Sequence, residues 1–194
     1  MSPAAADDRH AQDMTQALLV VDIQRTFAPP SWLIERISTL LPLMPSVGTI
    51  EIHDEGTVPF RRQLGWAPAD EDHCLVAVDR VFVKHGYAPS PEALAYLRSL
   101  AVERVLVCGI QADTCVLAAG FALFDAGLNP TLVADLVVGS SLDPSGSLGV
   151  RLWHHHFGRV VERHTDLPHA AVGATASTGH RRGVMSRSQS KPAR

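Results

Sequence analysis

Three short apolar runs without a polar interruption constrain the fold more than any other feature of the sequence. The runs cover residues 17–21, 105–108 and 131–134, and they are followed by Asp22, Gly109 and Asp135. Continuous apolar runs of this length are typical of strands covered on both faces, whereas strands with one wet face alternate apolar and polar residues. The sequence therefore predicts a sheet buried between two layers.

Helical patterns separate these runs. They cover residues 32–43, 91–100, 113–126 and 145–157, and further strands are expected over 47–53, 75–84 and 160–161. Asp113 is expected to cap the third helix, and Asp135 to organise the loop after its strand. Alternation of strands and helices predicts an α/β protein: a single-domain, three-layer α/β/α sandwich with a mostly parallel central sheet.

Length and composition fit one such domain. The chain has 194 residues, of which 46% are hydrophobic and 19% charged, so a sizeable core can be buried. The polar, Ala-rich segment 1–14 predicts a disordered N-terminal tail. The folded domain is expected over 15–165, and the Ser-, Arg- and Gly-rich segment 166–194 predicts a flexible basic tail.

Charge and cysteine content exclude several classes of function. Residues 180–194 hold five basic residues and no acid, so the formal charge of −3 leaves about −8 on the rest of the chain. A body this acidic argues against a nucleic-acid substrate. Three cysteines without paired spacing predict neither a disulfide framework nor a zinc motif. With no secretory signal and no membrane-spanning run, the protein is expected to be cytoplasmic and without a membrane partner.

Three chemically useful residues are expected at one edge of the sheet. Ligands of open parallel sheets bind beyond the carboxyl ends of the strands, where Asp22, Lys84 and Cys115 would meet. Cys115 lies in the predicted first turn after Asp113, where free amides and the helix dipole favour a thiolate with a pKa below its usual value. Taken singly, each residue has a plainer interpretation: a core thiol, a turn aspartate and a solvated lysine. Together they form a nucleophile, a base and a supporting cation.

The chain resembles the isochorismatase-like cysteine hydrolases, which include nicotinamidases and N-carbamoylsarcosine amidases. The segments that carry the resemblance are Ala-Leu-Leu-Val-Val-Asp-Ile-Gln with Phe27, then Val-Lys, and Val-Cys-Gly-Ile-Gln-Ala-Asp-Thr-Cys-Val. They begin at residues 17, 83 and 107, and the likeness runs from about residue 17 to 161. The last segment is the most specific of the three.

The resemblance implies a site and a reaction. The family's catalytic triad falls on Asp22, Lys84 and Cys115. A cis peptide is expected between Ile110 and Gln111, and the amides of Gln111 and Cys115 would form an oxyanion hole. Asp22 would take the thiol proton, and a C–N bond of a small amide or ureido substrate would be cleaved through a thioester. Relatives are homo-oligomers, so at least a dimer is expected.

Two departures from the family pattern limit what can be carried over. Nicotinamide-hydrolysing branches bind a metal through an Asp-x-His pair, but this chain has Glu51-Ile52-His53 and no clear further histidine. Neither a metal nor another cofactor is therefore expected, and His53 is interpreted as a pocket or loop residue. The segment 85–90 after Lys84 is short for the family. Phe27, Trp66 and Tyr87 are candidates for the substrate pocket, with ordinary core packing as the alternative.

Other functions stay open at the level of sequence. A catalytically weak or inactive binding or scaffold protein of the same fold is the main alternative, supported by the altered segment after Lys84. A thiol redox switch is less favoured because no resolving cysteine lies at short spacing. The run 154–156 of three histidines is interpreted as helix surface rather than a metal cluster, since consecutive helical residues point in different directions.

Overall fold

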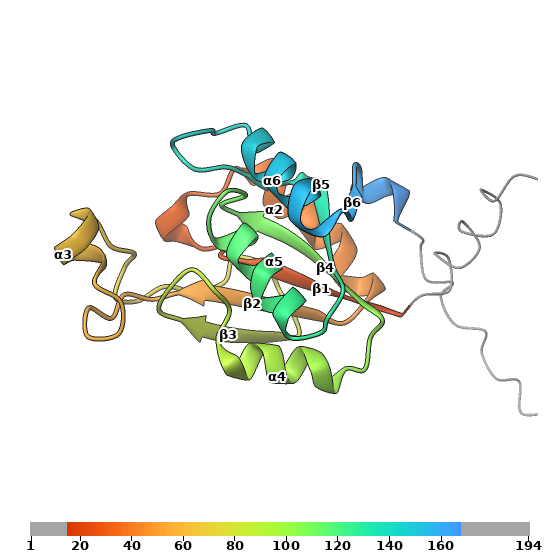
Figure 1. The fold of residues 1–194 in the computed structure, drawn as a ribbon, viewed down its shortest axis with the longest axis horizontal. Coiled ribbons are helices and arrows are strands. Elements are labelled where there is room, and N and C mark those ends of the chain that lie inside the picture. The colour runs from red at the N-terminus through yellow and green to blue at the C-terminus, as the bar shows by residue number, and fades with distance from the viewer. Residues whose placement is uncertain (1–14, 168–194) are drawn as a thin grey trace, which may run out of the picture.

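The computed structural model describes residues 15–167 (Figure 1). The tail expected over 1–14, and all but the first two residues of the tail expected over 166–194, lie outside the described residues. Leu167, which follows the domain boundary expected at residue 165, is 4% exposed and packs in the core. The packed part of the chain thus extends slightly beyond that expected boundary.

Six strands form one sheet in which every neighbouring pair is parallel, which confirms the predicted fold class. Their order is β3-β2-β1-β4-β5-β6. The strands are β1 (Gln16–Val21), β2 (Ser46–Glu51), β3 (Arg80–Lys84), β4 (Arg104–Ile110), β5 (Pro130–Val138) and β6 (Val160–Val161). The chain winds outward from β1 to one edge and then returns through β4 to the other.

Helices cover both faces of this sheet (Figure 1). The helices are α2 (Ser31–Leu40), α3 (Phe60–Leu64), α4 (Pro91–Ser99), α5 (Cys115–Asp125) and α6 (Ser147–Phe157). The side chains of α4, α5 and α6 pack in one core cluster, with Trp153 fully buried between helix and sheet. Those of α2 pack in a second cluster on the opposite face, with Leu33 and Ile37 buried. These are the three expected layers.

Several boundaries differ from the expectation. The helix expected over 32–43 ends at Leu40, and a 3-10 turn, η3 (Leu41–Leu43), carries its proline. The strand expected over 75–84 begins only at Arg80, because Asp79 accepts hydrogen bonds from Ser46 and holds a turn before it. The segment between β2 and β3, residues 52–79, carries α3, which was not expected because five residues give no periodicity. In Figure 1, α3 lies away from the sheet.

The two central strands approach each other closely where they end. Gly109 of β4 pairs with Val21 of β1, and its φ of +121° is a conformation that residues with a Cβ rarely adopt. A Cβ at this position would lie 2.1 Å from the Val21 carbonyl oxygen. The close approach sets the positions of the residues that follow, Asp22 after β1 and Ile110 at the end of β4.

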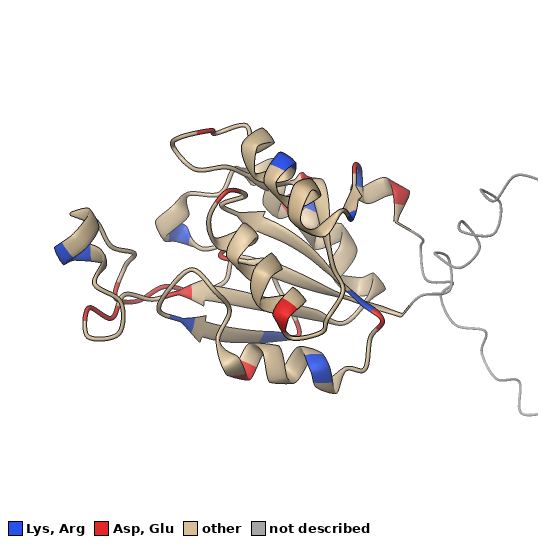
Figure 2. Ribbon diagram, in the orientation of Figure 1, with Lys and Arg blue, Asp and Glu red and all other residues tan. Residues whose placement is uncertain are grey.

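The described residues include no helix that is long and apolar enough to cross a bilayer. Acidic and basic residues are scattered over helices and loops in Figure 2, and α3 carries the adjacent pair Arg61 and Arg62. The three consecutive histidines, His154 to His156, are all exposed on α6, which confirms that they form helix surface.

Candidate active site

Four ionisable side chains meet at the carboxyl ends of β1, β2 and β3. The Lys84 ammonium lies 2.8 Å from Asp22 Oδ2, 2.8 Å from Glu51 Oε2 and 3.6 Å from Cys115 Sγ. Cys115 Sγ also donates to Glu51 Oε2 at 3.3 Å. None of the four residues is more than 4% exposed. The structure thus brings together the three expected residues, and it adds Glu51 as a fourth.

Strand register accounts for the meeting of Glu51 and Lys84. They are register partners at the ends of the parallel strands β2 and β3, so their side chains project from the same face of the sheet. Val47, four residues before Glu51, and Phe82, two residues before Lys84, lie on the same face and pack in the core cluster that contains Cys115. That face is therefore the one that α5 covers, and both charges point toward its first turn.

Neutral side chains hold the two carboxylates in place. Thr49 Oγ1 donates to Asp22 Oδ1 at 2.9 Å. The buried Gln24 side chain accepts from the Glu51 backbone amide at 2.6 Å and donates to the Glu51 carbonyl at 2.9 Å. Gln24 also donates to Asp72 at 3.2 Å. Gln24 therefore ties the end of β2 to the segment after β1, and it fixes the backbone that carries the Glu51 carboxylate.

Cys115 is the first residue of α5, but Asp113 does not cap that helix as expected. Thr114 occupies the N-cap position without a side-chain hydrogen bond. Asp113 instead accepts from the backbone amide and hydroxyl of Ser140, at 2.8 and 2.6 Å. An anionic acceptor forms strong bonds with two donors at once, and the loop after β5 supplies both. Asp113 therefore positions that loop beside the cysteine.

The turn before Cys115 contains a cis peptide bond between Ile110 and Gln111. Within residues 15–167, neither the Gln111 nor the Cys115 backbone amide has a hydrogen-bond acceptor. Amides at the start of a helix have no partner within the helix, so they are available to a ligand. Both residues line the cavity described below.

The resting cysteine is a thiol, in contrast to the thiolate expected from its position at a helix start. Burial raises the pKa of Cys115 well above its ordinary value, and the Asp22 and Glu51 carboxylates raise it further. Attraction to Lys84 opposes this rise without cancelling it. The sequence indicates the helix start, but it does not show that two carboxylates face the sulfur.

Burial and the neighbouring charges also shift the pKa values of Asp22 and Lys84. Burial raises the pKa of Asp22 to about 6, and Lys84 partly opposes that rise. Burial alone would lower the pKa of the Lys84 ammonium, but attraction to Asp22, Cys115 and Glu51 raises it above its ordinary value. Lys84 therefore stays charged at neutral pH, and Asp22 changes its charge close to neutral pH.

A cavity of about 330 Å³ opens at Cys115. Its lining includes large apolar or aromatic side chains and several polar ones. The former are Phe27, Leu64, Trp66 and Tyr87, and the latter are Gln111, Thr114, Ser140 and Ser141, together with Glu51 and Cys115. Three of the four expected pocket residues are thus present. His53 is not among the lining residues: its buried ring lies 3.3 Å from Glu55.

The described residues do not fit the metal site of nicotinamide-hydrolysing relatives. Glu51 occupies the place of the first ligand, but its carboxylate contacts Lys84 and Cys115. Within residues 15–167, the one group of three ligand-type side chains with atoms close together is Asp22, Glu51 and Cys115, within 4.8 Å. Lys84 contacts all three members, and a cation there would have to compete with its ammonium.

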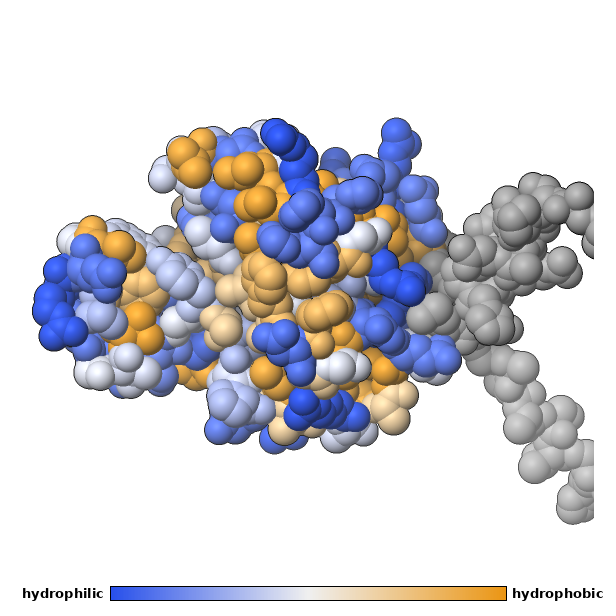
Figure 3. Space-filling view, in the orientation of Figure 1, coloured by the Kyte–Doolittle hydropathy of each residue, from blue (hydrophilic) through white to orange (hydrophobic). Residues whose placement is uncertain are grey.

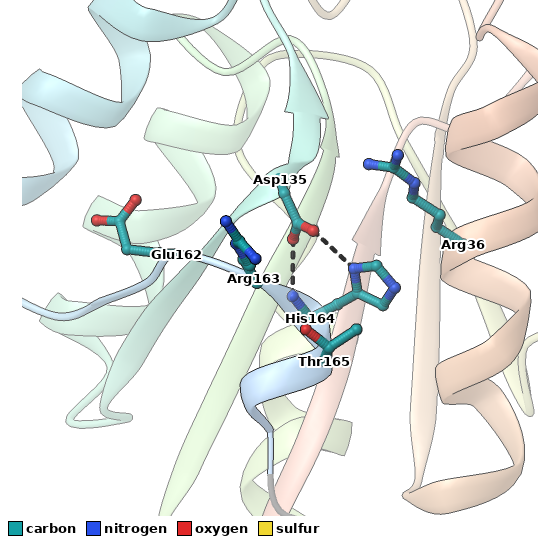
Figure 4. A pocket seen from close by; sticks show the side chains of 6 residues that line it. All are labelled: Arg36, Asp135, Glu162, Arg163, His164 and Thr165. Carbon is teal, nitrogen blue, oxygen red and sulfur yellow. Dashed lines mark hydrogen bonds and ion pairs between the residues drawn. The ribbon is translucent and has the colours of Figure 1, made fainter.

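A second and larger cavity, of about 590 Å³, lies beside α2 and shares no lining residue with the first (Figure 4). Asp135 lies within β5 rather than before a loop, which corrects the expectation for this residue. Its carboxylate accepts from the backbone amide and Nδ1 of His164, at 2.8 and 2.7 Å. It thereby attaches the 3-10 turn η4 (His164–Asp166) to the sheet.

Comparison with known proteins identifies the class to which this site belongs. The isochorismatase domain family matches residues 48–164, and the chain belongs to this family. It is therefore an isochorismatase-like hydrolase. No curated protein sequence matches the chain.

Solved structures agree with this fold. Pyrazinamidase of Pyrococcus horikoshii, solved in complex with zinc, superposes with a TM-score of 0.64 and 21% identity over 75% of this chain and 98% of that one. N-carbamoylsarcosine amidase from Thermoplasma acidophilum gives 0.60 and 22%, over 77% and 96%. A nicotinamidase/pyrazinamidase from Acinetobacter baumanii gives 0.63 and 19%, over 80% and 99%. At such identities the likeness establishes the fold alone.

Proposed function

We propose that the protein is a cysteine hydrolase that cleaves a C–N bond of a small amide or ureido compound. The observation that carries this proposal is the cluster at Cys115: a buried sulfur next to carboxylates and an ammonium, at the mouth of a cavity. A nucleophile, an acid–base group and an orienting charge are the components of covalent acyl transfer.

The reaction proceeds through a thioester. Cys115 Sγ attacks the substrate carbonyl while its proton passes to a carboxylate of the cluster, and the oxyanion rests on the Gln111 and Cys115 amides. The C–N bond then breaks, and the departing nitrogen takes a proton from Asp22. Water attacks the thioester, gives its proton to Asp22, and releases the acid and the thiol. Lys84 compensates the negative charges throughout.

The cavity restricts the substrate to a small molecule. Its volume of about 330 Å³ is at the lower end of the range for ligand sites. The aromatic rings of Phe27 and Trp66 lie 6.0 Å apart and offer an apolar surface to a flat group. Ser140 and Ser141 also line the cavity and provide hydroxyls to a second polar group.

A screen of small primary amides and ureido compounds for ammonia release tests the proposal. The wild-type protein should release ammonia from at least one compound, and Cys115→Ala, which lacks the nucleophile, serves as the blank. Equal release by both proteins would refute cysteine catalysis. If no compound in a broad set reacted, a binding or scaffold role for the same fold would be favoured instead.

The pH dependence of turnover gives a second test. Because the pKa of Asp22 is raised to about 6, its active anionic form is lost as the pH falls below that value. We expect kcat/KM to fall about tenfold per pH unit below pH 6, and Asp22→Asn to lose this limb together with most of its activity. The folded pKa exceeds the ordinary value of 3.8, so the contribution of Asp22 to stability is greatest below pH 4 and is lost as the pH rises through 6. A rate limb near pH 4 would contradict this assignment.

Self-association and localisation remain predictions. Apolar residues gather over α5 and α6 in the view of Figure 3. Phe121 and Phe124 of α5 are 42% and 59% exposed there, and both contact Phe157 of α6. Exposed apolar surface of this kind favours the homo-oligomer that the family resemblance implies. Light scattering of the purified protein measures its mass directly. The cytoplasmic location stays an expectation from the sequence.

A further inference from the structure

We infer that Glu51 Oε2, and not Asp22, is the group that receives the Cys115 proton when the sulfur attacks. This assignment rests on the proposed function, because it names a proton acceptor for the same nucleophile. It divides the acid–base work between two carboxylates. Glu51 takes the proton of the sulfur and returns it, and Asp22 gives a proton to the departing nitrogen and takes one from the attacking water.

Hydrogen-bond geometry carries the assignment. The hydrogen bonds of Cys115 Sγ are donation to Glu51 Oε2, at 3.3 Å, and a contact with the Lys84 ammonium at 3.6 Å. No hydrogen bond joins Asp22 to the sulfur within residues 15–167: its Oδ1 accepts from Thr49, and its Oδ2 lies 2.8 Å from Lys84. A general base must be within hydrogen-bond reach of the proton it abstracts. Among the described residues, Glu51 is the carboxylate that meets this requirement.

The charges around the sulfur make such an acceptor necessary. The groups that face Cys115 are Asp22 after β1, Glu51 on β2, Lys84 on β3 and Tyr87 after β3. Burial and the two carboxylates keep the sulfur protonated at rest. Attack must then be accompanied by proton transfer, since a free thiolate is scarce. The proton already lies in a hydrogen bond to Glu51.

Hydrogen bonds and an ion pair hold the accepting carboxylate of Glu51 in place. Gln24 fixes the Glu51 backbone through both of its polar groups, and Lys84 binds the accepting oxygen itself. The proton leaves Sγ for Glu51 as the S–C bond forms. Lys84, whose ammonium lies 2.8 Å from both carboxylates, gives a proton to Asp22 and takes this one from Glu51, so that Asp22 can protonate the departing nitrogen. When the thioester is hydrolysed, Asp22 takes a proton from water and Lys84 carries it back to Glu51 by the reverse exchange. Glu51 then returns it to the sulfur as the S–C bond breaks. Protons and electrons balance over one cycle.

Acylation by p-nitrophenyl acetate isolates this step. Its nitrophenolate leaves without a proton, so the burst reports attack by sulfur and does not need Asp22 as an acid. With enzyme in excess, the wild-type burst rate should be constant from pH 7 to 8.5. Glu51→Gln should be slower at pH 7 by about 10²-fold or more, and should gain tenfold per pH unit, because it must use the free thiolate. Asp22→Asn should keep the flat profile.

Other outcomes decide against the inference. A flat profile for Glu51→Gln with a sloped one for Asp22→Asn would make Asp22 the acceptor and leave the proposed function intact. Sloped profiles for both would show that neither carboxylate acts alone, which also overturns the assignment. A wild-type burst no larger than that of Cys115→Ala would refute the nucleophile and the inference together.

Glu51→Asp covers the possibility that Glu51→Gln does not fold. This variant keeps the charge beside Lys84 but withdraws the carboxylate by one methylene. It should give a flat profile at a lower rate, since the base is present but misplaced. A rate equal to that of the wild type would overturn the assignment. A lower rate caused by a structural defect alone would come with a sloped profile.

Discussion

Replacement of Lys84 by Met is expected to lower the free energy of unfolding by about 3–5 kcal/mol at pH 7 and to abolish activity. The ammonium lies 2.8 Å from each of two carboxylates that are 1% exposed or less. Met has a similar length but no charge, so the two anions would face each other in the interior without compensation. Urea unfolding followed by circular dichroism measures the change.

The pH and a second substitution distinguish this cause from altered packing. The loss should shrink at pH 5, where protonation of Asp22 removes one of the uncompensated charges. The double variant Lys84→Met with Glu51→Gln should likewise recover part of the stability. A loss below about 1 kcal/mol, or one that does not change with pH, would show that water reaches the cluster and screens it.

Gly109→Ala should destabilise the fold by more than about 3 kcal/mol. The new Cβ would lie 2.1 Å from the Val21 carbonyl oxygen and 2.8 Å from its nitrogen, so β1 and β4 would have to separate. The φ of +121° adds conformational strain. Because Val21 directly precedes Asp22, activity should fall even in the fraction that folds.

Gly127→Ala is the matched control for this substitution. Gly127 also has a positive φ, +74°, but a Cβ there would meet no atom within 4 Å. Its cost should therefore be the left-handed backbone alone, about 1–2 kcal/mol. Equal losses for the two variants would mean that the strands separate without cost. The excess for Gly109 over Gly127 measures the close approach of β1 to β4.

Much of the fold follows from local sequence. Runs such as 17–21 and 105–108 are apolar throughout because both faces of these strands are covered. The carboxyl ends of these runs show at which edge of the sheet the site lies. The segment 75–84 shows the limit of this reasoning. Val76 and Val78 are as apolar as a strand requires, yet the turn held by Asp79 and Ser46 delays the strand to Arg80. That turn depends on Ser46, which begins β2 and is distant from Asp79 in the chain.

The candidate site, like the fold, could be predicted from the sequence only in part. Asp22 directly follows β1, Lys84 ends β3 and Cys115 begins α5, so topology alone brings them together. Glu51 was seen only as a departure from a metal motif, although a carboxylate at the end of an apolar strand already required a partner. The direction of its side chain depends on register with β3, which the sequence does not provide. Asp113 was assigned to its own helix because the loop that carries Ser140 is distant in the chain.

The cluster draws each member from a different element: Asp22 follows β1, Glu51 ends β2, Lys84 ends β3 and Cys115 starts α5. No single hairpin or helical unit contains two neighbouring members of it. The two carboxylates therefore depend for compensation on an ammonium that a different strand, β3, brings to the site. Conversely, detachment of β3 in the native protein would remove the ammonium and open the cavity at once. Catalytic competence thus depends on the stability of an edge strand.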